Sequence, residues 1–382
     1  MGDIYFLART YSPNAASDIR YRSFLSGFKG ETKISFVYFI PDADRSKFTS
    51  PYDNIDAIHL WENKCPSNKI LRHLFFYYQL LKFVIGLKND DVVVDLACCE
   101  MLPILFLKKG LKVYYEISEH PEISLYSTKL FAPSVEKFCS QCKRLTDLFV
   151  ISNALKDYFI EKGVDSERIH VINMTVDDSR FQSLCKNEGK DRYIAYCGTA
   201  SNNKDGVDQL IRSFSIVSKQ YTDVKLYIIG KTPNKNQAFS NGNLVKELNL
   251  EEKVIFTGAV PYTDVPQLLM DAEILALDRP DNKQAKYGFP TKLGEYLMTG
   301  NPVVITHVGD IPLFLTDNET ALIAAPDNEI SFAEKLIWAL ENPAEAKDIG
   351  IQGRQLAMKC FNGTIEGNKI MQIIKNQSNG TI

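Results

Sequence analysis

The segment YGFPTKLGEYLMTGNPVV, residues 287–304, has the features of a helix followed by a buried strand. Pro290 suits the first turn of a helix, and Gly300 suits the position just after its end. Val303 then begins a short apolar run that is typical of a strand. A glycine loop that enters a short helix and leads at once into an apolar strand predicts an α/β unit in this part of the chain.

Short apolar strands alternate with helical patterns on both sides of this segment. The expected strands of the first part are 4–8, 33–39, 57–61, 91–95, 112–117, 147–151 and 170–173. Those of the second part are 193–197, 225–229, 254–256, 274–277, 303–305 and 321–324. Because strands separated by helices form parallel sheets, the fold class is α/β, with two parallel sheets covered by helices.

A polar stretch at Asp177–Asp191 separates two parts of ordinary domain size. We therefore expect a first domain at residues 1–176 and a second at 177–362. The helical pattern near the end of the chain is interrupted at Cys360–Gly363, so a last helix within 363–382 can leave the second domain and pack elsewhere.

Composition excludes several classes of protein. The 382 residues include 44 Lys and Arg and 47 Asp and Glu, a net charge of −3, which leaves no basic excess for binding nucleic acid.

The opening MGDIYFLART has no basic and apolar leader, so we expect a cytoplasmic protein. Only Cys139 and Cys142 have a zinc-like spacing, and no second pair accompanies them; we expect no metal site.

Two loops have the features of a phosphate site. In YCGTASNNKDGV, residues 196–207, a strand ends in small polar residues before a helix, so backbone amides and Lys204 can meet an anion; the alternative is a solvated loop. The second is the start of the helix after Gly288, where the helix dipole favours phosphate at the carboxyl edge of a parallel sheet. Glu295, one turn further in, can accept hydrogen bonds from two ribose hydroxyls; otherwise it is a solvated helix glutamate.

A histidine follows another expected strand. In YYEISEHPE, residues 114–122, the strand leads into a polar loop that contains His120. A neutral imidazole at the carboxyl end of the strand can hydrogen-bond a sugar hydroxyl. A surface histidine that pairs with a neighbouring glutamate is the other interpretation.

These three sites together resemble those of the family 4 retaining glycosyltransferases, whose GT-B architecture has two facing Rossmann-like domains. The segment from Gly288 through Glu295 to GNPVV at 300–304 is similar to the family's E-G-F-x-x-x-x-x-E-x-x-x-x-G-x-P-V-V. Further similar segments run through nearly the whole chain: TYSPNAAS at 10–17 before a helix with Arg20 and Arg22, VINMTVDDSRF at 171–181, Lys204 before Gly206, FTG at 256–258 and VPQL at 265–268.

The resemblance implies a metal-independent transferase that moves a hexosyl or N-acetylhexosaminyl group from a UDP- or GDP-sugar to a glycan or lipid-linked acceptor in surface polysaccharide or glycoconjugate synthesis. It implies a nucleotide sugar as co-substrate and no further cofactor. It also implies an acceptor domain at 1–176, on which 363–382 packs back, and a donor domain at 177–362. The resemblance assigns catalysis to Lys204 and His120, an N-terminal loop to Ala15 and Ala16, and donor binding to Gly198, Thr199, Tyr287, Gly288, Phe289, Pro290, Thr291, Lys292 and Glu295.

Three positions depart from the family pattern. Tyr287 replaces the usual first glutamate, Thr199 replaces the arginine that commonly follows the loop glycine, and Ala15-Ala16 replaces a glycine pair. Each of these positions bears on contacts with the donor. A sugar-nucleotide-binding protein of the same fold, with weak or no catalytic activity, is therefore the alternative function.

Residues 68–88 predict a helix that is apolar on more than one face and carries Lys69, Arg72, Lys82 and Lys88. Its polar side chains disfavour a membrane-spanning helix. Two interpretations stay open. The helix is buried against the first sheet, with its charges at the ends and on one exposed strip, or it lies on the inner face of the cell membrane, where its aromatic residues and lysines meet anionic lipid.

Overall fold

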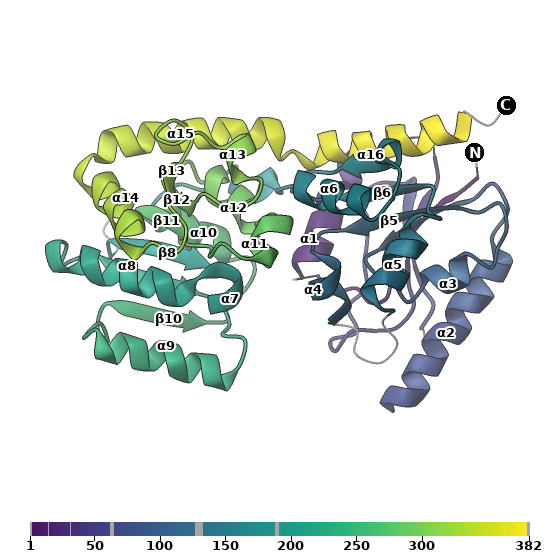
Figure 1. Cartoon of the computed structure of the whole chain (residues 1–382), viewed down its shortest axis with the longest axis horizontal. Coiled ribbons are helices and arrows are strands. Elements are labelled where there is room, and N and C mark those ends of the chain that lie inside the picture. The colour runs from purple at the N-terminus through teal and green to yellow at the C-terminus, as the bar shows by residue number, and fades with distance from the viewer. Residues whose placement is uncertain are drawn as a thin grey trace. The chain divides into compact units, whose positions relative to one another are not determined.

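The structure is a computed structural model that describes residues 2–13, 15–30, 32–61, 65–126, 133–187 and 191–379 (Figure 1). Asn14, within the N-terminal loop segment noted above, lies outside these ranges. The chain forms two compact units. Unit 1 consists of Met1–Thr175 together with Gly363–Ile382, and unit 2 consists of Val176–Asn362.

The sheet of unit 1 has seven parallel strands in the order β3-β2-β1-β4-β5-β6-β7. The strands are β1 (Ile4–Ala8), β2 (Ile34–Tyr38), β3 (Ile55–His59), β4 (Val92–Leu96), β5 (Lys112–Ile117), β6 (Asp147–Val150) and β7 (Ile169–Val171). Every residue of the central β4 is buried, as expected for a parallel strand covered on both faces. The strand order reverses between β1 and β4, so the carboxyl ends of these two strands form the place where ligands bind in such sheets.

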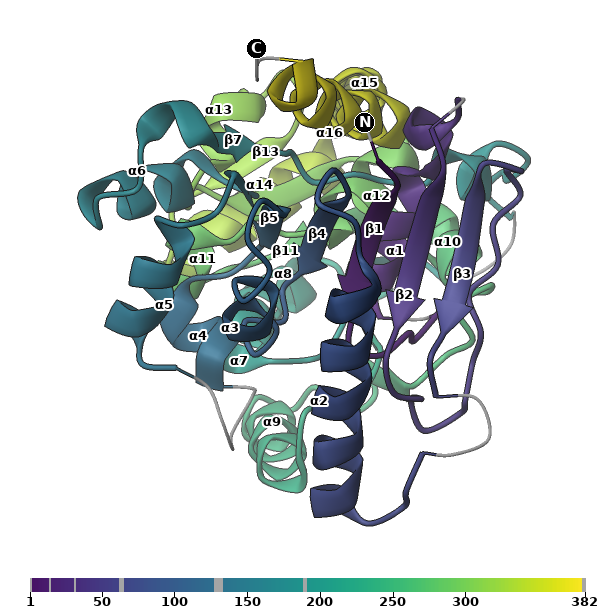
Figure 2. The same ribbon diagram turned by 90° about the vertical axis from the view of Figure 1, so that its right-hand side faces the viewer.

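The helices of unit 1 are α1 (Ala16–Ser23), α2 (Lys69–Gly86), α3 (Leu102–Leu105), α4 (Pro121–Tyr126), α5 (Val135–Cys142), α6 (Asn153–Glu161) and α16 (Gly363–Asn379). Figure 2 shows α2 beside the strands β1, β2 and β3. Helix α16 belongs to the core of this unit, because Ile370 and Ile374 pack in one buried cluster with residues of the sheet. Its Glu366 carboxylate accepts a hydrogen bond from the Asn173 amide at 3.0 Å.

The sheet of unit 2 has six parallel strands in the order β10-β9-β8-β11-β12-β13. They are β8 (Tyr193–Cys197), β9 (Lys225–Ile229), β10 (Val254–Gly258), β11 (Ile274–Leu277), β12 (Val303–Thr306) and β13 (Leu322–Ala324). The order reverses between β8 and β11, as it does between β1 and β4 in unit 1. The prediction of an α/β fold with two parallel, helix-covered sheets is confirmed.

The helices of unit 2 are α7 (Asn202–Asp205), α8 (Val207–Gln220), α9 (Lys235–Glu247), α10 (Val265–Asp271), α11 (Lys283–Tyr287), α12 (Lys292–Met298), α13 (Ile311–Phe314), α14 (Glu329–Glu341) and α15 (Pro343–Cys360), with a short 3-10 helix at Asp178–Phe181. One local prediction is wrong: Pro290 is not in the first turn of α12. The helix begins at Lys292, and the Pro290 carbonyl accepts a hydrogen bond from the Leu293 amide at 3.1 Å as the chain enters it.

Candidate functional site

The candidate site lies at the carboxyl edge of the unit 2 sheet, where the strand order reverses between β8 and β11. Strand β8 leads into the loop 198–201, and α7 begins there because the Ser201 hydroxyl accepts a hydrogen bond from the Lys204 amide at 3.2 Å. Asp278 and Arg279 follow the neighbouring strand β11 directly. The segments after two adjacent strands thus bring polar side chains to one edge of the sheet.

Four side chains form a buried polar group at this edge, which we name the Asp205 cluster: Asp205, Lys292, Arg279 and Tyr196. The Lys292 ammonium lies 2.5 Å from Asp205 Oδ2 and 3.0 Å from the Tyr196 hydroxyl. The Tyr196 hydroxyl is in turn 2.8 Å from Asp205 Oδ2, and Arg279 Nε lies 3.9 Å from Asp205 Oδ1. Two cations therefore share a single carboxylate, and the cluster has a net positive charge.

Burial makes these charges effective. The side chains of Asp205 and Arg279 are each 2% exposed, and that of Lys292 is 15% exposed. Burial raises the pKa of Asp205, but Lys292 and Arg279 outweigh this effect and hold it below its usual value. The pKa of Lys292 is lowered by burial and by the charges of Lys204 and Arg279, although Asp205 opposes this shift. A site with two cations and one carboxylate in a dry environment attracts an anion strongly.

Gly198 allows the Lys292 side chain to reach the loop after β8. Its φ is +149°, and a Cβ at this position would lie 2.6 Å from Lys292 Nζ. Gly206 ends α7 with φ +60°, and a Cβ there would lie only 1.9 Å from the Asp278 carbonyl oxygen. Gly206 is required because a side chain would meet the backbone of Asp278, whereas Gly198 is favoured by its positive φ.

Glu295 is paired with Arg180, a residue that sequence reasoning did not select. The Arg180 guanidinium forms an ion pair and a hydrogen bond with Glu295 Oε1, and its Nη2 donates to the Tyr262 carbonyl at 2.9 Å. The same guanidinium lies over the Tyr262 ring, 3.6 Å from its centroid. Burial raises the pKa of Glu295, and the Arg180 charge opposes the shift. The Glu295 carboxylate is therefore fixed by Arg180 and is not freely solvated.

The other residues predicted to bind the donor are near this edge but have different surroundings. The Gly288 amide donates to the Gln284 carbonyl at 3.0 Å, so this amide is already used within the chain. The Phe289 ring packs against Phe314 and Phe361, with centroids 5.4 and 5.6 Å away. The Thr199 carbonyl accepts a hydrogen bond from the Tyr196 hydroxyl at 2.7 Å. Tyr287 ends α11, and Pro290 and Thr291 join Phe289 to α12.

Lys204 is exposed at the end of α7, next to the Asp205 cluster. Its carbonyl oxygen lies 3.5 Å from Arg279 Nε, and its charge lowers the pKa of Lys292. The sequence suggested Lys204 from the loop pattern, but nothing in the sequence joins Asp205 to Lys292, 87 residues away. Arg279 was not predicted either. Its position two residues after a strand at which the strand order reverses is the signal in the sequence that could have indicated it.

The predicted residues of unit 1 lie at the carboxyl edge of its own sheet. His120 is only 3% exposed, its Nδ1 accepts a hydrogen bond from the Glu122 amide at 3.3 Å, and its ring meets Tyr158 edge-on at 4.5 Å. The interpretation of His120 as an exposed surface residue is therefore wrong. Ala15 caps α1 and Ala16 is its first residue, after the end of β1.

A second group at this edge was not predicted. The Arg9 guanidinium, just beyond β1, pairs with Glu100 in the loop after β4 and contacts His73 Nδ1 at 3.0 Å. Arg9 also lies over the Phe76 ring, 4.8 Å from its centroid. Arg9 and Glu100 thus join the segments after the two strands at which the order of this sheet reverses.

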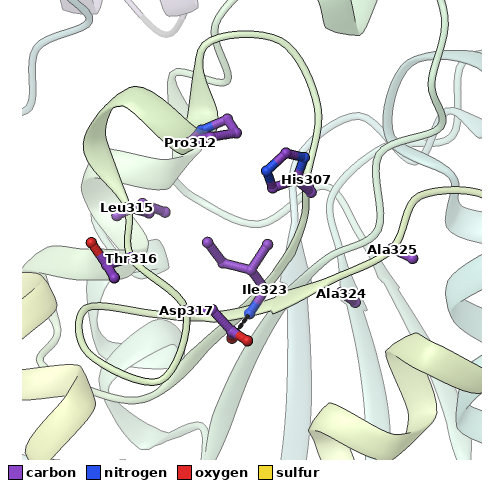
Figure 3. Close-up of a pocket in the computed structure, with 8 residues that line it drawn as sticks. All are labelled: His307, Pro312, Leu315, Thr316, Asp317, Ile323, Ala324 and Ala325. Atoms are coloured by element: carbon purple, nitrogen blue, oxygen red, sulfur yellow. Dashed lines mark hydrogen bonds between the residues drawn. The ribbon is translucent and has the colours of Figure 1, made fainter.

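A cavity of about 420 Å³ lies elsewhere in unit 2, beside β12 and β13 (Figure 3). It is lined by His307, Pro312, Leu315, Thr316, Asp317, Ile323, Ala324 and Ala325. The Asp317 carboxylate accepts a hydrogen bond from the Ile323 amide at 2.7 Å and from Lys335 at 2.6 Å. Its charge is thus already paired, and none of the predicted site residues lines this cavity.

Within the described ranges, no three or more His, Cys, Asp or Glu side chains are grouped so that they could hold a metal ion. No helix in the part of the chain that the structure describes has the length and hydropathy needed to cross a bilayer.

Two relatives of similar sequence are transferases by name. The chain is 24% identical over 345 residues to MMP alpha-(1->4)-mannosyltransferase of Mycolicibacterium hassiacum, a match that covers 85% of this chain and 80% of the relative. It is 27% identical over 297 residues to N-acetylgalactosamine-N,N'-diacetylbacillosaminyl-diphospho-undecaprenol 4-alpha-N-acetylgalactosaminyltransferase of Campylobacter jejuni, covering 75% of this chain and 77% of the relative.

Solved structures show the fold. Anabaena HepE in complex with UDP matches with a TM-score of 0.73 at 16% identity, covering 98% of this chain and 100% of that chain. A glycosyltransferase from Rickettsia africae matches with a TM-score of 0.74 at 13% identity over the whole of both chains. The fold is GT-B. Residues 178–356, which include the Asp205 cluster and Glu295, match the family described as "Glycosyl transferases group 1". Over these residues the chain is similar to the group 1 glycosyltransferases.

Proposed function

We propose that the chain transfers a hexosyl or N-acetylhexosaminyl group from a UDP- or GDP-sugar to a glycan or lipid-linked acceptor, with retention of anomeric configuration and without a metal ion. The Asp205 cluster is the observation that carries this proposal. Lys292 and Arg279 share one buried carboxylate at the point where the order of the unit 2 strands reverses. A diphosphate is negatively charged, so a cluster with a net positive charge at this edge of the sheet attracts it.

The reaction requires a site for negative charge that develops on the leaving group. The acceptor hydroxyl oxygen forms a bond to the anomeric carbon, the bond from that carbon to the diphosphate oxygen breaks, and the hydroxyl proton passes to the leaving diphosphate. Lys204 is exposed beside the cluster and can approach this oxygen, while Lys292 supplies fixed charge below the loop that starts at Gly198. Fixed positive groups that face developing charge are among the largest contributions to catalysis.

Glu295 is proposed to hold the ribose. Arg180 occupies one of its carboxylate oxygens, Oε1, and a carboxylate has lone pairs left for hydroxyl donors. Glu295→Gln is expected to weaken UDP or GDP binding about tenfold, the effect of losing one charge-assisted hydrogen bond. In isothermal titration calorimetry, Glu295→Gln should weaken binding of the 2′-deoxy nucleotide much less than binding of the normal nucleotide. Equal losses for both nucleotides would mean that Glu295 acts only through the structure.

The acceptor is proposed to bind unit 1, where His120 and the Ala15-Ala16 segment lie beyond the carboxyl ends of strands. The names of two relatives include lipids: a phosphatidylinositol monomannoside in one from Mycolicibacterium smegmatis and a diphospho-undecaprenol in the Campylobacter protein. A lipid-linked acceptor in surface polysaccharide or glycoconjugate synthesis would place the enzyme in the cytoplasm at the inner face of the membrane.

The alternative is a sugar-nucleotide-binding protein with little or no activity. Thr199 and Tyr287, which stand where the family has an arginine and a glutamate, favour it. One experiment distinguishes the two functions. The protein is incubated with UDP- and GDP-sugars, in the presence of EDTA and with or without candidate acceptors, and released UDP or GDP is measured.

Acceptor-dependent release in EDTA supports the transferase, whereas strong nucleotide binding with no release supports the binding protein. Lys204→Ala is expected to lower turnover by roughly 100-fold, as for other groups that stabilise developing charge, with little change in stability because the side chain is exposed. Lys219→Ala, at an exposed position in α8, is a matched control. Normal turnover in Lys204→Ala would remove Lys204 from the site. The configuration of the transferred sugar, read by NMR, tests retention.

A further inference from the structure

The outer face of α2 is apolar and open to solvent. Six large side chains on this one helix are between 42% and 71% exposed: Ile70, Leu71, Leu74, Tyr78, Leu81 and Ile85. Their spacing of three and four residues places them along one side of the helix. We name this set the α2 face. Single exposed apolar side chains are ordinary, but a continuous row of this kind marks an interaction surface.

The opposite side of α2 fixes which residues face outward. Phe76, Leu80 and Val84 are buried, and the Phe76 ring meets Phe39 edge-on at 5.7 Å. The Gln79 amide donates to the Leu60 carbonyl at 2.5 Å. One side of the segment packs as the core-helix interpretation expects, but the exposed strip carries large apolar side chains as well as charges.

Polar contacts hold the amino-terminal end of α2 as well. The Arg72 guanidinium donates to the Pro41 carbonyl, and His73 contacts Arg9 at 3.0 Å. Because Arg9 follows β1 directly, this end of the helix lies at the carboxyl edge of the unit 1 sheet. Rotation of the helix to hide the α2 face would break these contacts, so exposure of the face is built into the unit.

The charged side chains of the α2 segment itself are all positive. Residues 65–89 contain no Asp or Glu, although the whole chain has a net charge of −3. Lys69, Lys82 and Lys88 are exposed, and Lys108 donates to the Leu87 carbonyl beyond the carboxyl-terminal end of α2. Next to Lys108, Leu107 is 69% exposed. An apolar row with lysines at both ends, on a segment that carries no acidic side chain, is complementary to a layer of apolar chains beneath anionic headgroups.

We propose that the α2 face binds the interface of a lipid bilayer that contains anionic lipids, with the helix parallel to the surface. A second copy of the chain fits this face less well, because two-fold pairing would bring the lysines of both copies together. The helix is inserted only to the depth of its exposed side chains, and Tyr78 lies at the level of the headgroups. The proposal goes beyond the proposed transfer reaction, and its test requires neither donor nor acceptor.

Flotation of the full chain with liposomes tests the proposal. One set of vesicles is phosphatidylcholine alone, and the other contains phosphatidylglycerol as well. The apolar variant combines Ile70→Gln, Leu74→Gln and Ile85→Gln. Its matched control combines Phe239→Gln, Leu313→Gln and Ile330→Gln, three side chains that are 60% to 71% exposed on other helices. Circular dichroism and thermal unfolding verify that both variants fold.

We expect the wild type to float with the phosphatidylglycerol vesicles and the apolar variant to lose at least tenfold in its partition coefficient. The control should stay within twofold of the wild type. A variant with Lys69→Gln, Lys82→Gln and Lys88→Gln should lose binding to the anionic vesicles at low salt and differ little from the wild type at high salt.

Three results would overturn the proposal. The first is that the wild type does not float with anionic vesicles, and the second is that the apolar variant floats as well as the wild type. The third is that sedimentation shows a wild-type dimer that does not bind vesicles, together with a monomeric apolar variant, which would assign the α2 face to a second copy. Nucleotide-sugar turnover is measured separately, so loss of flotation and loss of activity are distinguishable.

Discussion

Replacing Asp205 with asparagine should destabilise unit 2 because it leaves two buried cations without their shared carboxylate. In the wild type, Lys292 is 2.5 Å and Arg279 is 3.9 Å from the Asp205 carboxylate. Removing one member of a buried ion pair typically costs ~3–5 kcal/mol, since the remaining charge stays uncompensated. Two cations remain here, so we expect a loss of at least about 3 kcal/mol in the free energy of unfolding of this unit.

Lys292→Met should lower the free energy of unfolding in the wild type and raise it in the Asp205→Asn variant. In the wild type it removes a bond to a charged group, worth about 2 kcal/mol, and leaves Asp205 with Arg279. In Asp205→Asn it removes one of two unpaired cations, so it should stabilise the protein. A change of sign is a stronger test of the geometry than either loss alone, because independent sites would give the same value twice.

The two tryptophans of the chain make the measurement specific to one unit. Trp61 is in unit 1 and Trp338 is in α14 of unit 2. In a Trp61→Phe background, urea unfolding followed by tryptophan fluorescence reports on Trp338. The reasoning is refuted if Asp205→Asn costs less than about 1 kcal/mol or if Lys292→Met has the same sign in both backgrounds.

Two further predictions concern residues around the same edge. Burial raises the pKa of Asp278 to about 8, so the folded state holds a proton that the unfolded state releases above about pH 4, and stability falls as the pH rises between these values. Asp278→Asn should therefore gain stability relative to the wild type by about 1.4 kcal/mol per pH unit between pH 5 and 7; a pH-independent difference in urea unfolding would contradict this. Gly198→Ala should cost ~1–3 kcal/mol because alanine is strained at φ +149° and meets Lys292. Gly242→Ala, in α9 with no atom within 4 Å of the added Cβ, should be neutral or stabilising by up to ~1 kcal/mol; equal effects of the two changes on thermal unfolding would show that the loop is not strained.

The strands were predictable because each buried parallel strand is a short continuous apolar run. Each of the thirteen expected strands occurs within the described residues, and only the strand ends differ, by one or two residues. The ends depend on local hydrogen bonds that the apolar pattern does not contain. The start of α12 shows this, because the Pro290 carbonyl receives a bond from Leu293 before the helix proper begins.

The ion pairs of the candidate site were not predictable in the same way. Lys292 and Glu295 were expected to face the donor, but their partners Asp205 and Arg180 are 87 and 115 residues away. Such pairs arise from the order of strands in the sheet and not from spacing along the chain. For α2 the difficulty was different, since apolar residues on two sides fit both interpretations. Tertiary contacts such as those of Phe76 and Gln79 show which side is inside.

Thr199 shows why a departure from a family pattern has to be examined together with its surroundings. The resemblance places an arginine at this position, after the loop glycine, and its absence suggests a site that has lost positive charge. In the structure, the Lys292 ammonium lies 2.6 Å from where a Cβ of Gly198 would be and 4.6 Å from the centre of the Tyr196 ring. A cation from α12 therefore stands beside the same loop, and Arg279 follows the adjacent strand. Because Asp205 neutralises only one of them, the edge keeps a net positive charge without the arginine.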